Sequence, residues 1–215
     1  MPVSRFEKLL PLTGVLAGVL FAVNGFVSKV PSEYGDPAAL QMMKDNMLRN
    51  FVAAIAGGLF CVAMVFFATA VRRALRTAEG GEATYSVAAF GGGLLLAASK
   101  ATDGRLMLAG IDAADQGDRA SVATLGYLGM DSWLPWVAAS AAFFLATGLG
   151  ALRNAVLPRW LAIATVVLGV LCLLGPTGVA VYVVTPVWLV LTGVVLSRRQ
   201  ASEQEVSVPG PSVRV

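Results

Sequence analysis

The sequence of 215 residues contains no histidine and only two cysteines. Histidine is the commonest metal-ligating side chain and the usual proton shuttle near neutral pH. Its absence excludes a histidine-ligated haem, a di-iron centre with histidine ligands and Ser-His-Asp catalysis. Cys61 and Cys172 lie inside apolar runs, so we interpret them as small buried residues. We therefore predict no metal site and no cofactor, and any acid–base chemistry falls to Asp, Glu, Lys, Tyr or Cys.

Charge is also scarce, because only 13% of the residues are charged against the ~25% of soluble domains. In contrast, 57% are hydrophobic and the mean hydropathy is +0.74. Apolar runs of roughly 20 residues, the length that crosses ~30 Å of hydrocarbon, recur along the chain. We predict an all-α, polytopic membrane helix bundle of about six transmembrane helices in residues 1–199. A disordered cytoplasmic tail is expected over residues 200–215.

The apolar runs place the expected spans at 9–27, 50–71, 85–110, 132–152, 158–175 and 178–196. Asp36-Pro37, between the first two, is a typical helix start with a capping side chain and proline at the first helical position. A short helix at the outer membrane interface is therefore expected from Ala38 to Met47. The fourth span belongs to a longer helical stretch from Arg119 to Leu152, in which Pro135 predicts a kink.

Lys and Arg indicate the orientation of these spans. With the N-terminus inside, the inner loops and ends hold ten of the 16 basic residues and the outer side holds six. The inner set is Arg5, Lys8, Arg72, Arg73, Arg76, Arg153, Arg159, Arg198, Arg199 and Arg214. By the positive-inside rule, both termini are expected in the cytoplasm of a multi-pass protein of the cytoplasmic (inner) membrane. The net charge of +3 has the same origin, so no nucleic-acid partner is expected.

Four segments carry a resemblance to known sequences: Asp45-Asn46-Met47-Leu48-Arg49, Ala70-Val71-Arg72-Arg73-Ala74-Leu75-Arg76, Leu157-Pro158-Arg159-Trp160 and Pro186-Val187-Trp188. With their spacing, residues 9–199 resemble a group of actinobacterial six-span membrane proteins of unknown function. The resemblance implies the membrane layout and no particular activity. In that group the third span is usually plain apolar sequence. Here its outer half reads Ser99-Lys100-Ala101-Thr102-Asp103-Gly104-Arg105, which suggests an activity acquired by this chain.

The charged segment of the third span is the first candidate site. Lys100 lies about 22 Å along the helix from Tyr85, in the outer third of the hydrocarbon. Charges at such depth are unfavourable in contact with lipid and often mark functional sites. Lys100 and Asp103 are three residues apart and can pair, and the Ser99 hydroxyl can donate to the Asp103 carboxylate. Arg105 lies on a different face of the helix.

The second candidate site surrounds Asp131, four residues before Pro135. Because proline has no N–H, the Asp131 carbonyl loses its helical partner. A carboxylate, a free carbonyl and nearby aromatic residues can form one wall of a polar pocket that opens outward. The expected further lining residues are Asn24 and Ser28 from the first span, together with Tyr127, Trp133 and Trp136.

Each of these features has a purely structural alternative. Lys100 and Asp103 can form a structural ion pair or extend to the outer headgroups. Asp131 can be the N-cap of the fourth span. Tyr127, Trp133 and Trp136 can belong to the interfacial aromatic belt.

Three functional classes follow from these patterns. The first is a cofactor-independent cyclase or isomerase for a lipophilic small molecule, with Asp103 or Asp131 as general acid and Lys100 tuning that acid. Its substrate-binding residues would be Arg105, Asn24, Ser99, Tyr127, Trp133 and Trp136. The second is a membrane binding or accessory subunit. The third, a small transporter, is disfavoured because the charges lie at one end only. Membrane lipid is the expected partner in each class, and the oligomeric state is left open.

Overall fold

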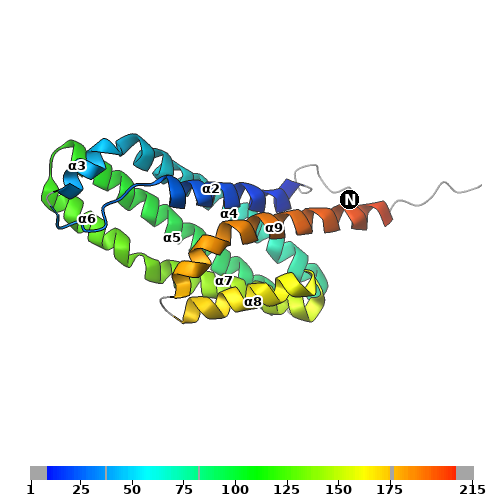
Figure 1. Ribbon diagram of the computed structural model, residues 1–215. Helices are drawn as coiled ribbons and strands as arrows, with labels where there is room; N and C mark the ends of the chain where they lie inside the picture. Colours follow the sequence, from blue (N-terminus) through cyan, green and yellow to red (C-terminus); the bar gives the residue numbers. More distant parts are fainter. Residues whose placement is uncertain (1–8, 37, 82, 175–176, 207–215) are drawn as a thin grey trace, which may run out of the picture.

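The computed structural model describes residues 9–36, 38–81, 83–174 and 177–206, and the regular elements within them are all helices. Successive long helices run antiparallel along one elongated bundle (Figure 1). A short 3-10 helix, η1, leads into the first of them. The elements are η1 (Leu10–Leu12), α2 (Thr13–Val27), α3 (Ala38–Asp45), α4 (Met47–Glu79), α5 (Thr84–Asp115), α6 (Arg119–Asp131), α7 (Trp133–Asn154), α8 (Arg159–Leu173) and α9 (Gly178–Val206).

Four helical stretches of the described chain are long and apolar enough to cross a membrane. They are Leu10–Val27, Met47–Glu79, Arg119–Asn154 and Ala180–Ser202. Large apolar side chains such as Leu16, Leu59 and Val62 are exposed on the outside of the bundle, where lipid can cover them. The chain is therefore an integral membrane protein with an all-α helical architecture, as the sequence predicted. The third and fifth expected spans correspond to α5 and α8. Helix α5 is not among the four apolar stretches, and α8 is shorter than any of them.

Helix α5 packs along α4 on one side and α7 on the other. Its glycines allow this close approach. A β-carbon at Gly92 would lie 2.6 Å from the backbone nitrogen of Phe143 on α7, and one at Gly104 would lie 3.0 Å from the carbonyl oxygen of Ala54 on α4. The helix that carries the charged segment thus packs closely between two neighbours. This packing shields part of the polar turn in an otherwise apolar bundle.

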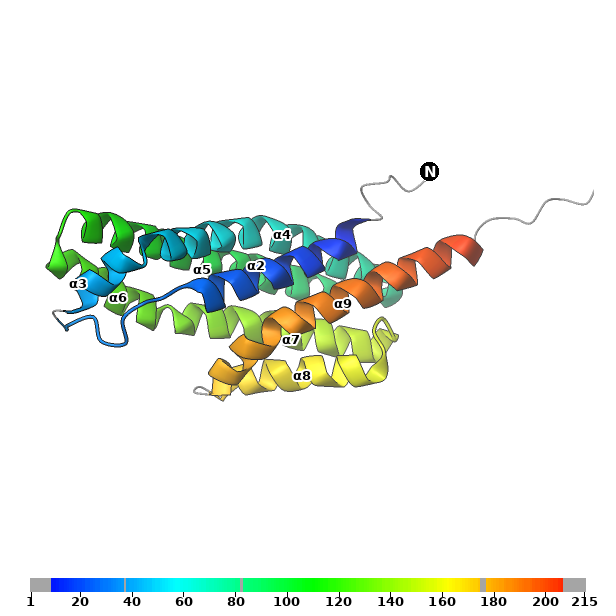
Figure 2. The same ribbon diagram turned by 45° about the horizontal axis from the view of Figure 1, so that its top comes forward.

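One end of the bundle carries a cap made by α3, α6 and the last turns of α5 (Figures 1 and 2). The cap has its own small core, separate from the main one, in which Tyr34, Met43 and Val122 are buried with Ala113 and Ala114. Helix α3 confirms the short helix expected from Ala38. The Asp36 carboxylate accepts a hydrogen bond from the Ala38 N–H at 2.7 Å, as a helix-start residue should, while Pro37 lies outside the described residues.

The helix boundaries differ from the expected ones in two places. Helix α9 continues to Val206, so residues 200–206 are helical and not part of a disordered tail, and residues 207–215 lie outside the described part. The long stretch from Arg119 is broken at Ser132 into α6 and α7, not kinked within one helix. Pro135 is the third residue of α7, where its missing N–H has no helical partner to lose.

Both ends of the described chain lie at the same end of the bundle, opposite the cap (Figures 1 and 2). Helix α9 crosses the bundle next to α2. It is also tied to α8, because the Trp188 indole N–H donates to the Thr165 hydroxyl at 2.7 Å. This crossing carries the first turns of α9 to the middle of the bundle, beside the charged segment of α5.

Candidate functional site

Lys100 and Asp103 form an ion pair on one face of α5, with Lys100 Nζ 2.7 Å from Asp103 Oδ2. The Lys100 side chain is only 6% exposed and that of Asp103 21%. The pair expected from the three-residue spacing is therefore confirmed. The alternative in which Lys100 extends to the outer headgroups is wrong, because the ammonium group is buried within the protein.

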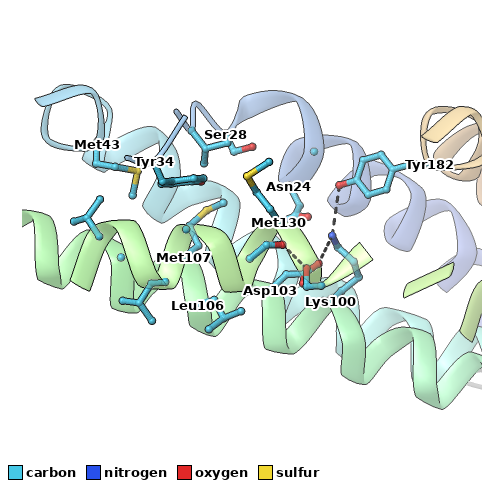
Figure 3. A pocket seen from close by; sticks show the side chains of 18 residues that line it. Asn24, Ser28, Tyr34, Met43, Lys100, Asp103, Leu106, Met107, Met130 and Tyr182 are labelled. Carbon is cyan, nitrogen blue, oxygen red and sulfur yellow. Dashed lines mark hydrogen bonds and ion pairs between the residues drawn. The ribbon is translucent and has the colours of Figure 1, made fainter. Parts of the chain in front are cut away.

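Aromatic side chains from two other helices surround the Lys100 ammonium. Its nitrogen lies 5.1 Å from the ring centroid of Tyr182 on α9 and 5.5 Å from that of Phe21 on α2. It also donates to the Tyr182 hydroxyl at 3.5 Å (Figure 3). Trp136 packs against Tyr182, with the two ring centroids 5.2 Å apart. Desolvated cation–π contacts contribute about 2 kcal/mol, so these rings help to hold the charge in the apolar bundle.

A cavity of about 280 Å³ lies beside the ion pair, between the cap and the main bundle. Lys100, Asp103, Asn24 and Tyr182 give its wall a polar part. Most of its remaining wall is apolar and rich in methionine. Its full lining is Asn24, Gly25, Ser28, Val30, Tyr34, Met43, Lys100, Asp103, Leu106, Met107, Gly110, Val122, Leu125, Gly126, Gly129, Met130, Ser132 and Tyr182. Figure 3 shows side chains from α2, the loop after it, α3, α5 and α9 arranged around this space.

The second oxygen of Asp103 is the unusual feature of the cavity wall. Oδ2 is bound by Lys100, whereas Oδ1 is buried and has no hydrogen-bond partner among the described residues. A buried acceptor without a partner is unfavourable by about 1–3 kcal/mol. An ionised carboxylate only accepts hydrogen bonds. The arrangement can therefore receive a donor, such as a hydroxyl or an N–H group, from a molecule in the cavity.

Asn24 supports the opposite wall of the cavity and is itself held in place. Its amide donates to the carbonyl oxygen of Ala53 on α4 at 2.9 Å. The close approach of the two helices is possible because Gly57 has no β-carbon, which would lie 3.0 Å from the Asn24 amide nitrogen. Sequence reasoning placed Asn24 and Ser28 in the pocket around Asp131. Both line this cavity together with Lys100 and Asp103, whereas Asp131 does not.

The other predicted site residues lie elsewhere. Asp131 is the exposed last residue of α6, and Arg105 is exposed on α5; neither lines the cavity. Ser132, not Asp131, is the N-cap residue of α7, so the capping alternative for Asp131 is wrong. Tyr127 and Trp133 are also exposed, as residues of an interfacial belt would be.

Two predicted residues are buried next to the ion pair without lining the cavity. Trp136 packs against Tyr182, and its indole nitrogen has no hydrogen-bond partner within the described structure. Ser99 is buried with its hydroxyl likewise unpartnered, so the predicted hydrogen bond from Ser99 to Asp103 is not formed. Sequence reasoning therefore identified the correct turn of α5 but not all of the contacts that this turn makes.

Sequence reasoning missed three aromatic residues of the site: Phe21, Tyr34 and Tyr182. Tyr182 comes from a helix about eighty positions later in the chain, and no local pattern connects it with Lys100. Tyr34 belongs to the loop after α2, and its burial against Gly126 raises the pKa of its phenol above the ordinary value of 10.0. In the sequence, the one signal for this contact was the small residue Gly126 on the buried face of α6.

Comparisons of the chain with protein-family models, with curated proteins and with solved structures find no match. The resemblance to actinobacterial six-span proteins stays a prediction. Function must therefore be argued from the chemistry of the cavity itself.

Proposed function

We propose that this integral membrane protein binds a lipophilic small molecule in the cavity beside Lys100 and Asp103. One observation carries the proposal. Asp103 lines a largely apolar cavity, and its Oδ1 is buried and has no hydrogen-bond partner among the described residues. An apolar cavity with a few converging polar groups is the usual form of a small-molecule site. The ligand would place its polar group against this oxygen and its apolar part against the methionines.

The ion pair has a defined role in this proposal. A lone carboxylate in an apolar wall would be strongly disfavoured, whereas Lys100 balances its charge at 2.7 Å. Because Lys100 binds only Oδ2, the other oxygen stays available to a ligand. The Phe21 and Tyr182 rings in turn hold the ammonium group in place. In this proposal the pair is structural and also supplies one acceptor for the ligand.

We further propose that the chain crosses the cytoplasmic membrane six times with both ends inside. Helix α5 is counted as a span because it packs between α4 and α7 and its Lys100–Asp103 pair is largely buried. Helix α8 has 15 residues, which is about 23 Å, so it needs local thinning of the bilayer. Arg72, Arg153 and Arg198 belong to the helix ends opposite the cap, which supports that end as the cytoplasmic one. The cavity then lies near the outer membrane surface.

An enzyme is the second candidate, and the same oxygen favours it. An unpartnered carboxylate oxygen can take a proton from a bound substrate, as the general base of a cofactor-independent isomerase or cyclase. The expected role of general acid suits Asp103 less well, because its other oxygen is bound to Lys100. Asp131 lies between two lining residues, but it is exposed and does not itself line the cavity, so it is not placed to act with Asp103. Binding is common to both candidates, so it is tested first.

A pair of neighbouring substitutions on α5 tests the binding proposal. Met107 lines the cavity and Leu108 does not, although both are partly buried. The full-length protein, purified in lipid nanodiscs, would be examined by native mass spectrometry for small molecules that remain bound after lipid washing. We expect a bound molecule in the wild type and in L108W, and its loss in M107W. Equal retention by all three proteins, or no retained molecule in any of them, would overturn the proposal.

A further inference from the structure

The cavity has an apolar mouth. Of the lining residues that the structure describes, Val30 and Met130 are the two exposed ones, at 44% and 54%. The polar lining groups of Lys100, Asn24 and Tyr34 are buried. A site that takes a water-soluble ligand from solution has no need of an apolar entrance. This arrangement instead suits a ligand that enters from the lipid and keeps its apolar part at the mouth of the cavity.

The surface around the mouth supports access from the membrane. Trp133 and Leu134 are exposed near Met130 at the junction of α6 and α7. Helix α5 has 32 residues and is about 48 Å long, which exceeds ~30 Å of hydrocarbon, so the capped end projects beyond the bilayer core. Lys100 is 16 residues from Thr84, about 24 Å along the helix, and lies below this boundary. The ion pair, at the inner end of the cavity, is therefore at the level of the outer leaflet.

The charges of the lining restrict the polar group of the ligand. Lys100 and Asp103 are the charged residues among the described lining residues, and they neutralise each other. An anionic head group would be repelled by the unpartnered Asp103 oxygen. A cationic head group would compete with Lys100 for the carboxylate. A neutral hydroxyl avoids both conflicts, because it donates to Oδ1 without adding charge.

The size of the cavity restricts the rest of the ligand. At about 280 Å³ it is at the lower end of the range of roughly 300–1,000 Å³ for small-molecule sites. It encloses the head and first carbons of a long-chain molecule but not a whole chain. The remaining chain must leave through the mouth, where Val30 and Met130 are exposed.

Taking the binding function as given, we infer that the ligand is a neutral lipophilic alcohol that enters sideways from the outer leaflet. Its hydroxyl group donates to Asp103 Oδ1, and its chain leaves between Val30 and Met130. Met130 is a flexible side chain at this mouth, which suits a gate that must open for the ligand.

Photolabelling in phosphatidylcholine nanodiscs tests this inference on the full-length protein. The probes are a long-chain primary alcohol and the carboxylic acid and primary amine of equal length, each with a diazirine close to the head group. Labelled peptides are mapped by mass spectrometry. We expect the alcohol to label the lining of α5 around Met107 about tenfold more than either charged probe, equivalent to about 1.4 kcal/mol. A second alcohol with the diazirine at its chain end should label the exposed residues around Met130.

Substitutions at the mouth complete the test. M130W and V30W narrow the mouth and should each lower labelling by the alcohol about tenfold. L128W is the matched control, because Leu128 is equally exposed on α6 and does not line the cavity; it should label as the wild type does. Folding of each variant is checked by its elution as a single species.

The outcomes separate this inference from the binding proposal. Equal or stronger labelling of the cavity by the acid or the amine would overturn the assignment to an alcohol. Equal labelling of M130W, V30W and L128W would overturn the lateral route. In either case the cavity is still labelled, and the binding proposal stands. If no probe labels the cavity, both the inference and the binding proposal fail.

Discussion

Lys100 of α5 donates to the hydroxyl of Tyr182 on α9 at 3.5 Å, and the ammonium nitrogen also lies 5.1 Å from the centre of that ring. The two helices are brought together here although the residues are far apart in sequence. The contact connects the charge of α5 with the last helix of the bundle. It follows that the polar site and the packing of α9 depend on each other.

Tyr182 should stabilise the site mainly through its ring. A hydrogen bond of 3.5 Å is long and weak, whereas the ring contacts Lys100, Phe21 and Trp136. We expect Y182F to lower the free energy of unfolding by less than about 1 kcal/mol and Y182A by about 2–4 kcal/mol. Thermal unfolding followed by tryptophan fluorescence measures both. Equal losses in the two variants would show that the hydroxyl, not the ring, is the stabilising group.

Removal of Lys100 alone should be more harmful than removal of the whole ion pair. K100M leaves the partly buried Asp103 without a counter-charge, which is unfavourable by about 3 kcal/mol. The double variant K100M/D103L removes both charges, and its stability should be within about 1 kcal/mol of the wild type. Thermal unfolding compares the three proteins. A double variant as unstable as K100M would contradict this account of the pair.

The same double variant separates stability from ligand binding. It keeps the apolar cavity but has no carboxylate oxygen for a hydroxyl group. We therefore expect it to fold and to lose labelling by the long-chain alcohol. Photolabelling that persists at the wild-type level would show that the ligand does not depend on Asp103.

Two glycines of α6 should respond differently to alanine. A β-carbon at Gly126 would collide with the Tyr34 ring, while one at Gly129 meets nothing within 4 Å. G126A should therefore expel Tyr34 and expose the loop after α2. G129A should be neutral or should stabilise the helix by about 0.5–1 kcal/mol. Hydrogen exchange in residues 28–36 measures the difference, and equal protection in the two variants would argue against the Tyr34 contact.

The start of α6 should weaken in acid. Hydrogen bonds from Ser121 and Ala120 hold the pKa of Asp118 below its ordinary value of 3.8. Because the folded pKa is the lower one, the stabilisation is present above the ordinary pKa and is lost as the pH falls through the lowered one.

Pepsin, which is active in acid, can measure this loss. Cleavage within residues 119–125 of the wild type should increase as the pH falls below the ordinary pKa of 3.8 and through the lowered one. In D118N the cap is kept, since asparagine is also a good N-cap residue, but the group no longer titrates. The increase attributable to Asp118 should therefore disappear in D118N, and an unchanged acid response would contradict the assignment.

Much of the fold follows from local sequence patterns. Continuous apolar runs predict helices near their observed positions, and the three-residue spacing of Lys100 and Asp103 predicts their ion pair. The continuation of α9 to Val206 was missed because the polarity of residues 200–206 resembles a disordered tail. Those residues include Ala, Gln and Glu, which are good helix formers and continue a helix that has already started.

The rest of the site depends on contacts between distant segments. Phe21 and Tyr182 reach Lys100 only after α2 and α9 have packed next to α5, and neither residue has a distinctive local signature. Asp131 looked like a site residue because of Pro135, but the helix ends at Asp131 and leaves the side chain exposed. Local chemistry identified the charged turn, and tertiary packing decided which groups share its cavity.

The most direct test of the central claim is an experimental structure of the protein in lipid with a bound long-chain alcohol. We predict density for the alcohol in the cavity, with its hydroxyl oxygen within hydrogen-bonding distance of Asp103 Oδ1 and its chain passing between Val30 and Met130. A cavity that holds only water in the presence of the alcohol, or an alcohol whose hydroxyl contacts another part of the protein, would contradict the account.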